Sequence, residues 1–105
     1  MNRALKNRME EIVILCQNYK VKSLYLMGEV NTKDEMDDYK EIDLLIDFYN
    51  IPKGELPDKM FQMTYLFEKL LQHKVVLFNW HEAEYLFVAT EGDADVVVLY
   101  QHPDS

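Results

Sequence analysis

Residues 41–48 read Glu-Ile-Asp-Leu-Leu-Ile-Asp-Phe, and this stretch decides which fold the chain is expected to adopt. The side chains of a β-strand point alternately to its two faces. The apolar face of this stretch holds Ile42, Leu44, Ile46 and Phe48. The opposite face holds Glu41, Asp43, Leu45 and Asp47. The pattern predicts a strand that buries its first face in a core and presents carboxylates on its second face.

Apolar residues outside this strand recur at helical spacing in two places, which predicts helices over roughly 3–18 and 57–72. Pro57 suits the first turn of the second helix, where its missing N–H costs no hydrogen bond. Short runs rich in β-forming residues predict three more strands. These strands lie at 22–27, 74–79 and 95–100.

The last third of the chain allows two interpretations. Residues 81–91 are predicted to be helical, whereas a hairpin between 85–90 and 95–100 also fits the β-forming residues there. With the helix, the order of elements is α-β-β-α-β-α-β. That order is typical of an α+β fold, here an α/β sandwich in which two to three helices pack on a mixed β-sheet of about four strands.

Length and charge restrict the function. The 105 residues suit a single domain over 1–105, and 49% hydrophobic with 29% charged residues is an ordinary globular composition. Lys and Arg total 11 against 19 Asp and Glu, so the formal net charge is −8. A nucleic acid held through its phosphates, or an anionic membrane surface, requires a basic face, so neither is expected as a partner.

Cysteine usage and hydropathy indicate the compartment. The single cysteine, Cys16, excludes an internal disulfide and a zinc site built from cysteines. The first residues contain no signal-peptide core, and no apolar run reaches the roughly 18–20 residues of a membrane span. We therefore expect a soluble, cytoplasmic protein.

The residues suited to chemistry lie around the strand at 41–48. Glu41 and Asp43 project from one face of that strand, with their Cβ atoms about 6–7 Å apart. That spacing lets both carboxylates reach one hard cation or two neighbouring ones, and Mg²⁺ prefers such ligands together with phosphate oxygens and water. Gly28, after the strand at 22–27, permits a tight turn whose N–H groups approach a phosphate. Together these features predict a nucleoside-triphosphate (NTP) site with metal-assisted phosphoryl transfer.

The chain resembles the minimal nucleotidyltransferases (MNT) of the DNA polymerase β-like superfamily over nearly its whole length. The similarity rests on the leading helix and on the segments 24–28, 41–48, 66–71, 74–77 and 99–100. The family pattern is Gly-Ser, a polar loop, Asp-x-Asp, and a third Asp on a later strand. The resemblance implies that the Gly-Ser turn holds the triphosphate and the first two aspartates bind metals. The third is a further ligand, or the base that activates the acceptor hydroxyl.

Most of the family's polar positions are altered in this sequence. Gly28 and Asp43 match the pattern, whereas Glu29 stands at the serine position and Glu41 at the first aspartate position. The third aspartate position, in the strand at 74–79, holds Val76. The resemblance thus assigns catalysis to Glu41 and Asp43, and nucleotide binding to Gly28 and Glu29. It assigns a Mg²⁺ ion to Glu41 and Asp43, with Glu29 as an optional third ligand.

These departures predict weak or absent transfer activity. Glu29 places a carboxylate where the γ-phosphate needs a donor, and like charges about 4 Å apart repel by roughly 4 kcal/mol at an effective dielectric constant near 20. The longer Glu41 displaces a metal ligand, which can cost about 10²-fold in rate. Val76 supplies no base, and losing a general base typically costs about 10²–10⁴-fold. Residues 28–47 also carry −6 of the −8 net charge, so free triphosphate is expected to bind poorly unless cations neutralise this segment.

Three functions stay open. The first is a catalytically impaired or inactive member that serves as a binding module, since family members often form the antitoxin half of a pair with a small helical HEPN-type protein. The second is an active Mg²⁺-dependent nucleotidyltransferase that moves an NMP from an NTP to a hydroxyl of a protein or small molecule. The third is a metal site alone, built by Glu29, Glu41 and Asp43. The sequence also leaves a homo-oligomer open.

Other polar and aromatic residues have simpler interpretations. Asp47 is expected to be solvated or salt-bridged, and the acids at 34–38 to form a solvated loop, because the glycine and glutamate of a calcium loop are missing. The three histidines share no metal-binding spacing and are expected in surface or structural roles. Cys16 is expected in the core. The aromatic residues of the last third lie either in the core or at an interface; they are Trp80, Tyr85, Phe87 and Tyr100.

Overall fold

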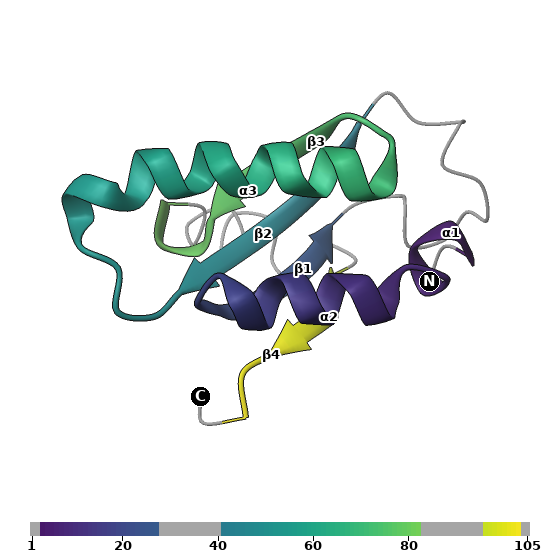
Figure 1. The fold of residues 1–105 in the computed structure, drawn as a ribbon, viewed down its shortest axis with the longest axis horizontal. Helices are drawn as coiled ribbons and strands as arrows, with labels where there is room; N and C mark the ends of the chain where they lie inside the picture. Colours follow the sequence, from purple (N-terminus) through teal and green to yellow (C-terminus); the bar gives the residue numbers. More distant parts are fainter. Residues whose placement is uncertain (1–2, 28–40, 83–95, 104–105) are drawn as a thin grey trace.

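The computed structural model describes residues 3–27, 41–82 and 96–103, and Figure 1 shows their arrangement. The helices are α1 (Arg3–Lys6), α2 (Met9–Asn18) and α3 (Leu56–Leu71), and a 3₁₀ turn, η3 (Lys53–Glu55), precedes α3. The strands are β1 (Val21–Met27), β2 (Ile42–Phe48), β3 (Val75–Asn79) and β4 (Val96–Gln101). All four predicted strands are therefore present, and none is shifted by more than one residue at either end.

The leading helix is divided in two. The sequence predicts one helix over 3–18, but the chain turns at Asn7 and Arg8 between α1 and α2. The N–H of Arg8 donates to the carbonyl of Leu5 at 3.0 Å, which closes α1 as a short turn. Asparagine is a poor helix former, so the break comes at a weak point of the pattern. Leu5 remains fully buried, and the break therefore redirects the chain without removing this residue from the core.

The helix α3 begins and ends close to its predicted limits. Pro57 lies in its first turn, as the sequence indicates, while the turn η3 before it is not predicted. The helix ends at Gln72, which adopts a left-handed conformation with φ 53°. The Oε2 atom of Glu68 accepts a hydrogen bond from the N–H of Val75 at 3.0 Å, which ties the last turns of α3 to the first residue of β3.

The four strands form one mixed sheet in the order β3-β2-β1-β4. The strand β1 is antiparallel to both β2 and β4, whereas β2 and β3 are parallel and are connected through α3. Parallel neighbours require such a crossover connection. In this topology the start of β2 lies beside the end of β1 and beside the start of β3.

Both long helices cover the same face of the sheet. Figure 1 shows α2 and α3 side by side across it. The apolar face predicted for β2 lies beneath them, since Ile42, Leu44 and Ile46 are buried in one cluster with residues of both helices and of β1. The helical members of this cluster include Ile12, Cys16, Met63, Phe67 and Leu71. The α+β sandwich and the core position of Cys16 are therefore confirmed.

The predicted helix at 81–91 and the first strand of the alternative hairpin, at 85–90, fall mostly or wholly on residues outside the described part of the structure. Residues 80–82 form a helical turn directly after β3, and residues 83–95 lie outside the described part of the structure. Among the helices that the structure describes, none has the length and apolar character needed to cross a bilayer.

Candidate functional site

Asp43 lies near the start of β2, on the sheet face opposite α2 and α3. The N–H of Ile42 donates to the carbonyl of Lys74 at 2.8 Å, which anchors the start of β2 to the chain just before β3. In the ladder, Asp43 is flanked by Met27 of β1 and by Val76 of β3. Glu41 precedes the strand and is exposed. This end of the sheet is where the sequence places the metal ligands.

The carboxyl group of Asp43 is poorly satisfied. Its Oδ1 atom is buried and has no hydrogen-bond partner among the described residues. Burial raises the pKa of Asp43, and the charge of Glu41 and a side-chain hydrogen bond with Glu41 raise it further. The two carboxyl groups thus lie in contact, and the negative charge of the pair is costly in the absence of a cation.

Two adjacent carboxylates match part of what a divalent cation requires. Hard oxygen ligands suit Mg²⁺, which usually binds one or two carboxylates and keeps several waters. The unpartnered Oδ1 of Asp43 is an atom that such an ion would satisfy. Within the described ranges, however, no group of three or more His, Cys, Asp or Glu side chains is placed to hold a metal ion. The donor set described here is therefore limited to Glu41 and Asp43.

Val76 occupies the neighbouring position on β3. The parallel register places it directly beside Asp43. Adjacent strands lie about 4.8 Å apart, so a carboxylate at this position would reach the same cation as Asp43. The valine side chain carries no oxygen and can neither bind a metal nor accept a proton. The missing third carboxylate is therefore a feature of the site's geometry as well as of the sequence.

The predicted phosphate-binding turn lies outside the described residues. Gly28 and Glu29 both belong to the segment 28–40 that the structure does not describe. The assignment of nucleotide binding to this turn, and the third-ligand role of Glu29, stay predictions. The last described residue before this turn is Met27, at the end of β1, and it pairs with Asp43 in the antiparallel ladder. Strand pairing thus brings the chain before Gly28 to the start of β2, as the site requires.

A second polar cluster lies at the other end of β2. Asp47 is only 9% exposed, and its Oδ1 atom lies 3.1 Å from Nε2 of His81. The Oδ1 atom of Asn79 accepts a hydrogen bond from the N–H of His81 at 2.8 Å, which positions the turn after β3. The contact of Asp47 with His81 is an ion pair only when the imidazole is protonated, and sequence reasoning did not find this partner. The two residues are far apart in sequence, and only the parallel pairing of β2 with β3 brings them together.

The aromatic residues of the last third separate into different environments. Trp80 stacks on Tyr25 with ring centroids 5.3 Å apart. Because Tyr25 is paired with Leu45, this stack helps to bury Leu45 on the face opposite the helices. Tyr100 belongs to the core, where burial raises its pKa. Tyr85 and Phe87 lie outside the described residues, so the predicted interface is not tested by them.

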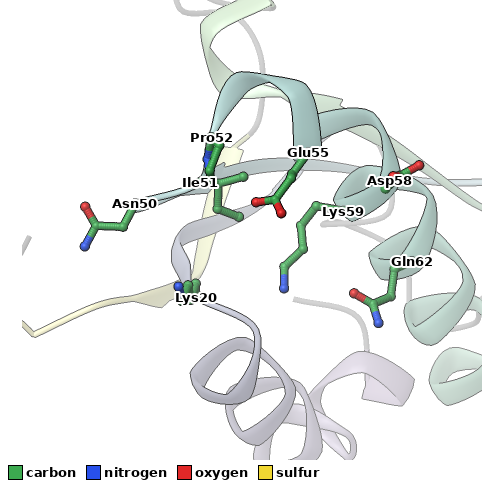
Figure 2. A pocket seen from close by; sticks show the side chains of 8 residues that line it. All are labelled: Lys20, Asn50, Ile51, Pro52, Glu55, Asp58, Lys59 and Gln62. Carbon is green, nitrogen blue, oxygen red and sulfur yellow. The ribbon is translucent and has the colours of Figure 1, made fainter.

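Two cavities flank the connection from β2 to α3, at the Asp47 end of the sheet. One has a volume of about 700 Å³ and is bordered by Asp47, Asn79 and His81 together with apolar residues of the connection. The other has a volume of about 460 Å³ and lies between the α2–β1 turn and the start of α3, as Figure 2 shows. Neither is lined by Glu41 or Asp43.

The comparisons with known proteins find similarity in structure and none in sequence families or curated proteins. No family model matches the sequence. No curated protein matches it either. A variant of the MntA–HpeT toxin–antitoxin pair with two Asp-to-Glu substitutions superposes with a TM-score of 0.67 at 13% identity, over 91% of this chain and 75% of the matched chain.

Two further solved structures give similar values. A toxin–antitoxin structure with AMP-PNP has a TM-score of 0.62 at 16% identity, over 91% of this chain and 75% of the other. The complex of the tri-AMPylated Shewanella oneidensis HEPN toxin with an MNT antitoxin has a TM-score of 0.61 at 15% identity, over 94% and 74%. The fold is that of the minimal nucleotidyltransferases. At these identities the likeness establishes the MNT fold alone, and the chemistry depends on the residues of this chain.

Proposed function

We propose that this chain is a catalytically impaired or inactive protein with the MNT fold, which acts in the cytoplasm as an antitoxin-type binding partner of a small helical HEPN-type protein. The observation that carries the proposal is the position of Val76 beside Asp43 in the parallel ladder. The scaffold that would present an active site is retained, while a group needed for the chemistry is missing.

The chemistry of nucleotidyl transfer explains why the residue at position 76 matters for activity. Metal-assisted transfer needs a cation on the attacking and leaving oxygens and a base, or a metal-bound oxygen, at the acceptor hydroxyl. Glu41 and Asp43 supply two carboxylates, which suffice to bind one cation. Val76 removes the group that the family resemblance assigns to a further metal ligand or to the base. We therefore expect metal binding without efficient transfer.

The proposed partner follows from the structural neighbours. The Shewanella oneidensis neighbour is a HEPN toxin in complex with an MNT antitoxin, and the MntA–HpeT neighbour is also a toxin–antitoxin pair. The MntA–HpeT structure carries glutamates in place of two aspartates that are two positions apart. That fold thus accommodates glutamate at such positions, which supports retention of a binding scaffold in a chain that has Glu41.

A transfer assay with a site variant tests the proposal. The full chain is incubated with α-labelled ATP, Mg²⁺ or Mn²⁺, and a HEPN-type toxin, beginning with the Shewanella oneidensis protein. We expect no more labelled product from the wild type than from Asp43→Asn, and equal toxin binding by both in a co-purification experiment. Turnover that Asp43→Asn abolishes would contradict the impaired activity. Loss of toxin binding in Asp43→Asn would contradict a binding role that is independent of the site.

One observation favours the active nucleotidyltransferase as a second candidate. The buried, unpartnered Oδ1 of Asp43 beside Glu41 is a ready position for a cation, and an NTP could arrive with that cation bound. Calorimetry with ATP and Mg²⁺ separates the two candidates. Saturable binding at submillimolar ATP, lost in Asp43→Asn, supports the enzyme, whereas no binding at millimolar ATP supports the binding module. Mn²⁺ binding without ATP, lost when Glu29 is replaced by glutamine, supports the site built for metal alone.

A further inference from the structure

The cavity between the α2–β1 turn and the start of α3 is built from polar side chains. Its volume of about 460 Å³ is in the range of small-molecule sites. The lining comes from three separate parts of the chain, and its polar members are Lys20, Asn50, Glu55, Asp58, Lys59 and Gln62. The cavity lies beyond the end of β2, whose last residue, Phe48, is about 17 Å from Asp43 by the rise of a strand. This cavity is therefore separate from the candidate catalytic site.

The charged groups of this cavity form no ion pairs with one another among the described residues. The Nζ atom of Lys59 lies 4.9 Å from the centre of the Tyr19 ring, and this cation–π contact fixes the ammonium group. Figure 2 shows Glu55 and Gln62 directed toward the same space as Lys59, while Asp58 points away from it. Neither Lys20 nor Lys59 forms an ion pair with another described residue. Two ammonium groups, two carboxylates and two amides thus border the cavity, and of these the carboxylate of Glu55 and the amide of Gln62 face the same space as Lys59 in Figure 2.

Two residues of the cavity wall have a left-handed backbone. Lys20 has φ 59° and Asn50 has φ 55°, which is the left-handed region that glycine adopts without cost. A hydrogen bond of 3.1 Å from the N–H of Tyr49 to the carbonyl of Lys20 joins the two turns. Asparagine tolerates this conformation, but lysine does not favour it. A left-handed residue directly after a helix is a common way for the helix to end, and Lys20 follows α2 in this way, so its conformation sets the turn that forms this side of the cavity.

We propose that this cavity binds a small zwitterion with adjacent carboxylate and ammonium groups, in other words a free α-amino acid. Lys20 and Lys59 bind its carboxylate, Glu55 binds its ammonium group, and the amide of Gln62 faces its side chain. A ligand that carries both charges matches a wall that carries both charges. A simple anion would meet the carboxylate of Glu55, and a simple amine would meet two lysines, so each is disfavoured by like-charge repulsion.

The test uses the full chain and defined probes. Each proteinogenic L-amino acid is added separately at millimolar concentration, and Tm is measured by differential scanning fluorimetry. The best ligand is then compared by calorimetry with the matched acid that lacks the amine and with the matched amine that lacks the carboxylate. We expect at least one amino acid to raise Tm and to bind at least about tenfold more tightly than either analogue, since each lost charged hydrogen bond has roughly that effect.

Three variants separate binding from folding. Lys20→Gly removes the ammonium group and relieves the backbone strain, so it should fold at least as well as the wild type and still bind at least about tenfold more weakly. Lys59→Gln should weaken binding to a similar extent. Lys69→Gln removes an exposed lysine of α3 outside the cavity and should leave binding unchanged.

The proposal is overturned by any of three results. One is a panel in which no amino acid raises Tm. Another is equal binding of the acid that lacks the amine, which would indicate a site for simple anions. The third is retention of full affinity by Lys20→Gly and Lys59→Gln, or equal weakening by Lys69→Gln. Because Lys20→Gly is expected to keep its Tm without ligand, a loss of affinity in this variant cannot be attributed to unfolding.

Discussion

The two ends of β2 carry one aspartate each on the same face of the sheet, and their surroundings are opposite. Asp43, near the start, has a buried oxygen with no hydrogen-bond partner in the described ranges and a second carboxyl group beside it. Asp47, near the end, is bonded to His81 at 3.1 Å. A carboxylate on this face is therefore not by itself a sign of a metal site. The informative aspartate is the one whose buried oxygen has no partner among the described residues.

The two ends of β2 also differ in the charged residues around them. Segment 28–43, which leads into the Asp43 end, contains seven of the eight acids in 28–47 and both of its bases. The opposite end carries Lys20, Lys53 and Lys59 around its two cavities. An acidic end suits cations, and a mixed end suits ligands that carry both charges. The four predictions below test whether the two ends differ in this way, beginning with the largest expected effect.

Val76→Asp should convert the Asp43 end into a stronger cation site. A third carboxylate beside Asp43 adds a Coulombic attraction of about 4 kcal/mol per unit of cation charge at 4 Å and an effective dielectric constant of 20, part of which is spent on desolvation. We expect Mn²⁺ to bind about a hundredfold more tightly than to the wild type, equivalent to about 2.7 kcal/mol. Calorimetric titration with Mn²⁺ measures the change.

The matched control for this variant is Val76→Asn. Its side chain is close in size to aspartate and has one oxygen but no charge, so it should give at most a small gain in affinity. A gain as large as that of Val76→Asp would mean that shape, and not charge, limits the site. No gain in either variant would mean that Val76 does not face the cation position that Asp43 and Glu41 define.

Asp47→Ala should destabilise the protein by about 1–3 kcal/mol, because it removes a hydrogen bond to a charged group and leaves the turn after β3 less well anchored. His81→Ala tests the same contact from the other side, and its exposed side chain contributes little packing. Urea unfolding of both single variants and the double variant gives the coupling energy, which we expect near 1 kcal/mol. A coupling energy of zero would contradict the ion pair as the reason for the burial of Asp47.

The sequence predicts the fold better than it predicts these contacts. The alternation at 41–48 suffices to place Ile42, Leu44 and Ile46 in the core, because period and hydrophobicity are local properties. The pairing of Asp47 with His81 depends on which strands become neighbours, and nothing local specifies that β2 and β3 are parallel. The break at Asn7 is missed for a related reason: the apolar spacing of Leu5, Met9 and Ile12 continues across it.

The candidate site also has some features that the sequence predicts and others that it does not. The position of Val76 beside Asp43 follows from the family resemblance and is seen in the strand register. The unpartnered Oδ1 of Asp43 could not be predicted, since it depends on which side chains surround it. The cavity at Lys20 and Asn50 has no sequence signal either. Both residues are polar turn residues in the sequence, and only their left-handed backbone distinguishes them.

Asp43→Asn should change stability in a pH-dependent way. Because burial and the neighbouring Glu41 raise the pKa of Asp43 in the folded state above its ordinary value, the folded protein binds this proton more tightly than the unfolded chain does. The ionised group therefore lowers stability at pH 7, and this penalty disappears as the pH falls through the raised pKa. We expect Asp43→Asn to stabilise the protein at pH 7 by up to about 1 kcal/mol, the usual limit for a partly exposed charge.

Urea unfolding at pH 7 and near pH 4 measures this effect, and the gain should shrink at the lower pH. The matched variant is Asp47→Asn, which removes the charge of the carboxylate that contacts His81 and should destabilise the protein at pH 7. The same substitution at the two ends of β2 is thus expected to give opposite signs. Destabilisation by Asp43→Asn at pH 7 would mean that its carboxylate has a partner in solution, such as a bound cation.

Gln72→Gly should give the smallest effect, a stabilisation of about 0.5 kcal/mol. Gln72 ends α3 with φ 53°, a conformation that costs an ordinary residue about 1–2 kcal/mol and glycine very little. The greater freedom of glycine in the unfolded chain offsets about 0.4–1 kcal/mol of that gain. Asn50→Gly is the counterpart at the other end of the sheet and should gain less, because asparagine already tolerates the left-handed region. If urea unfolding shows the larger gain for Asn50→Gly, the strain is concentrated at the cavity, and the end of α3 is relaxed.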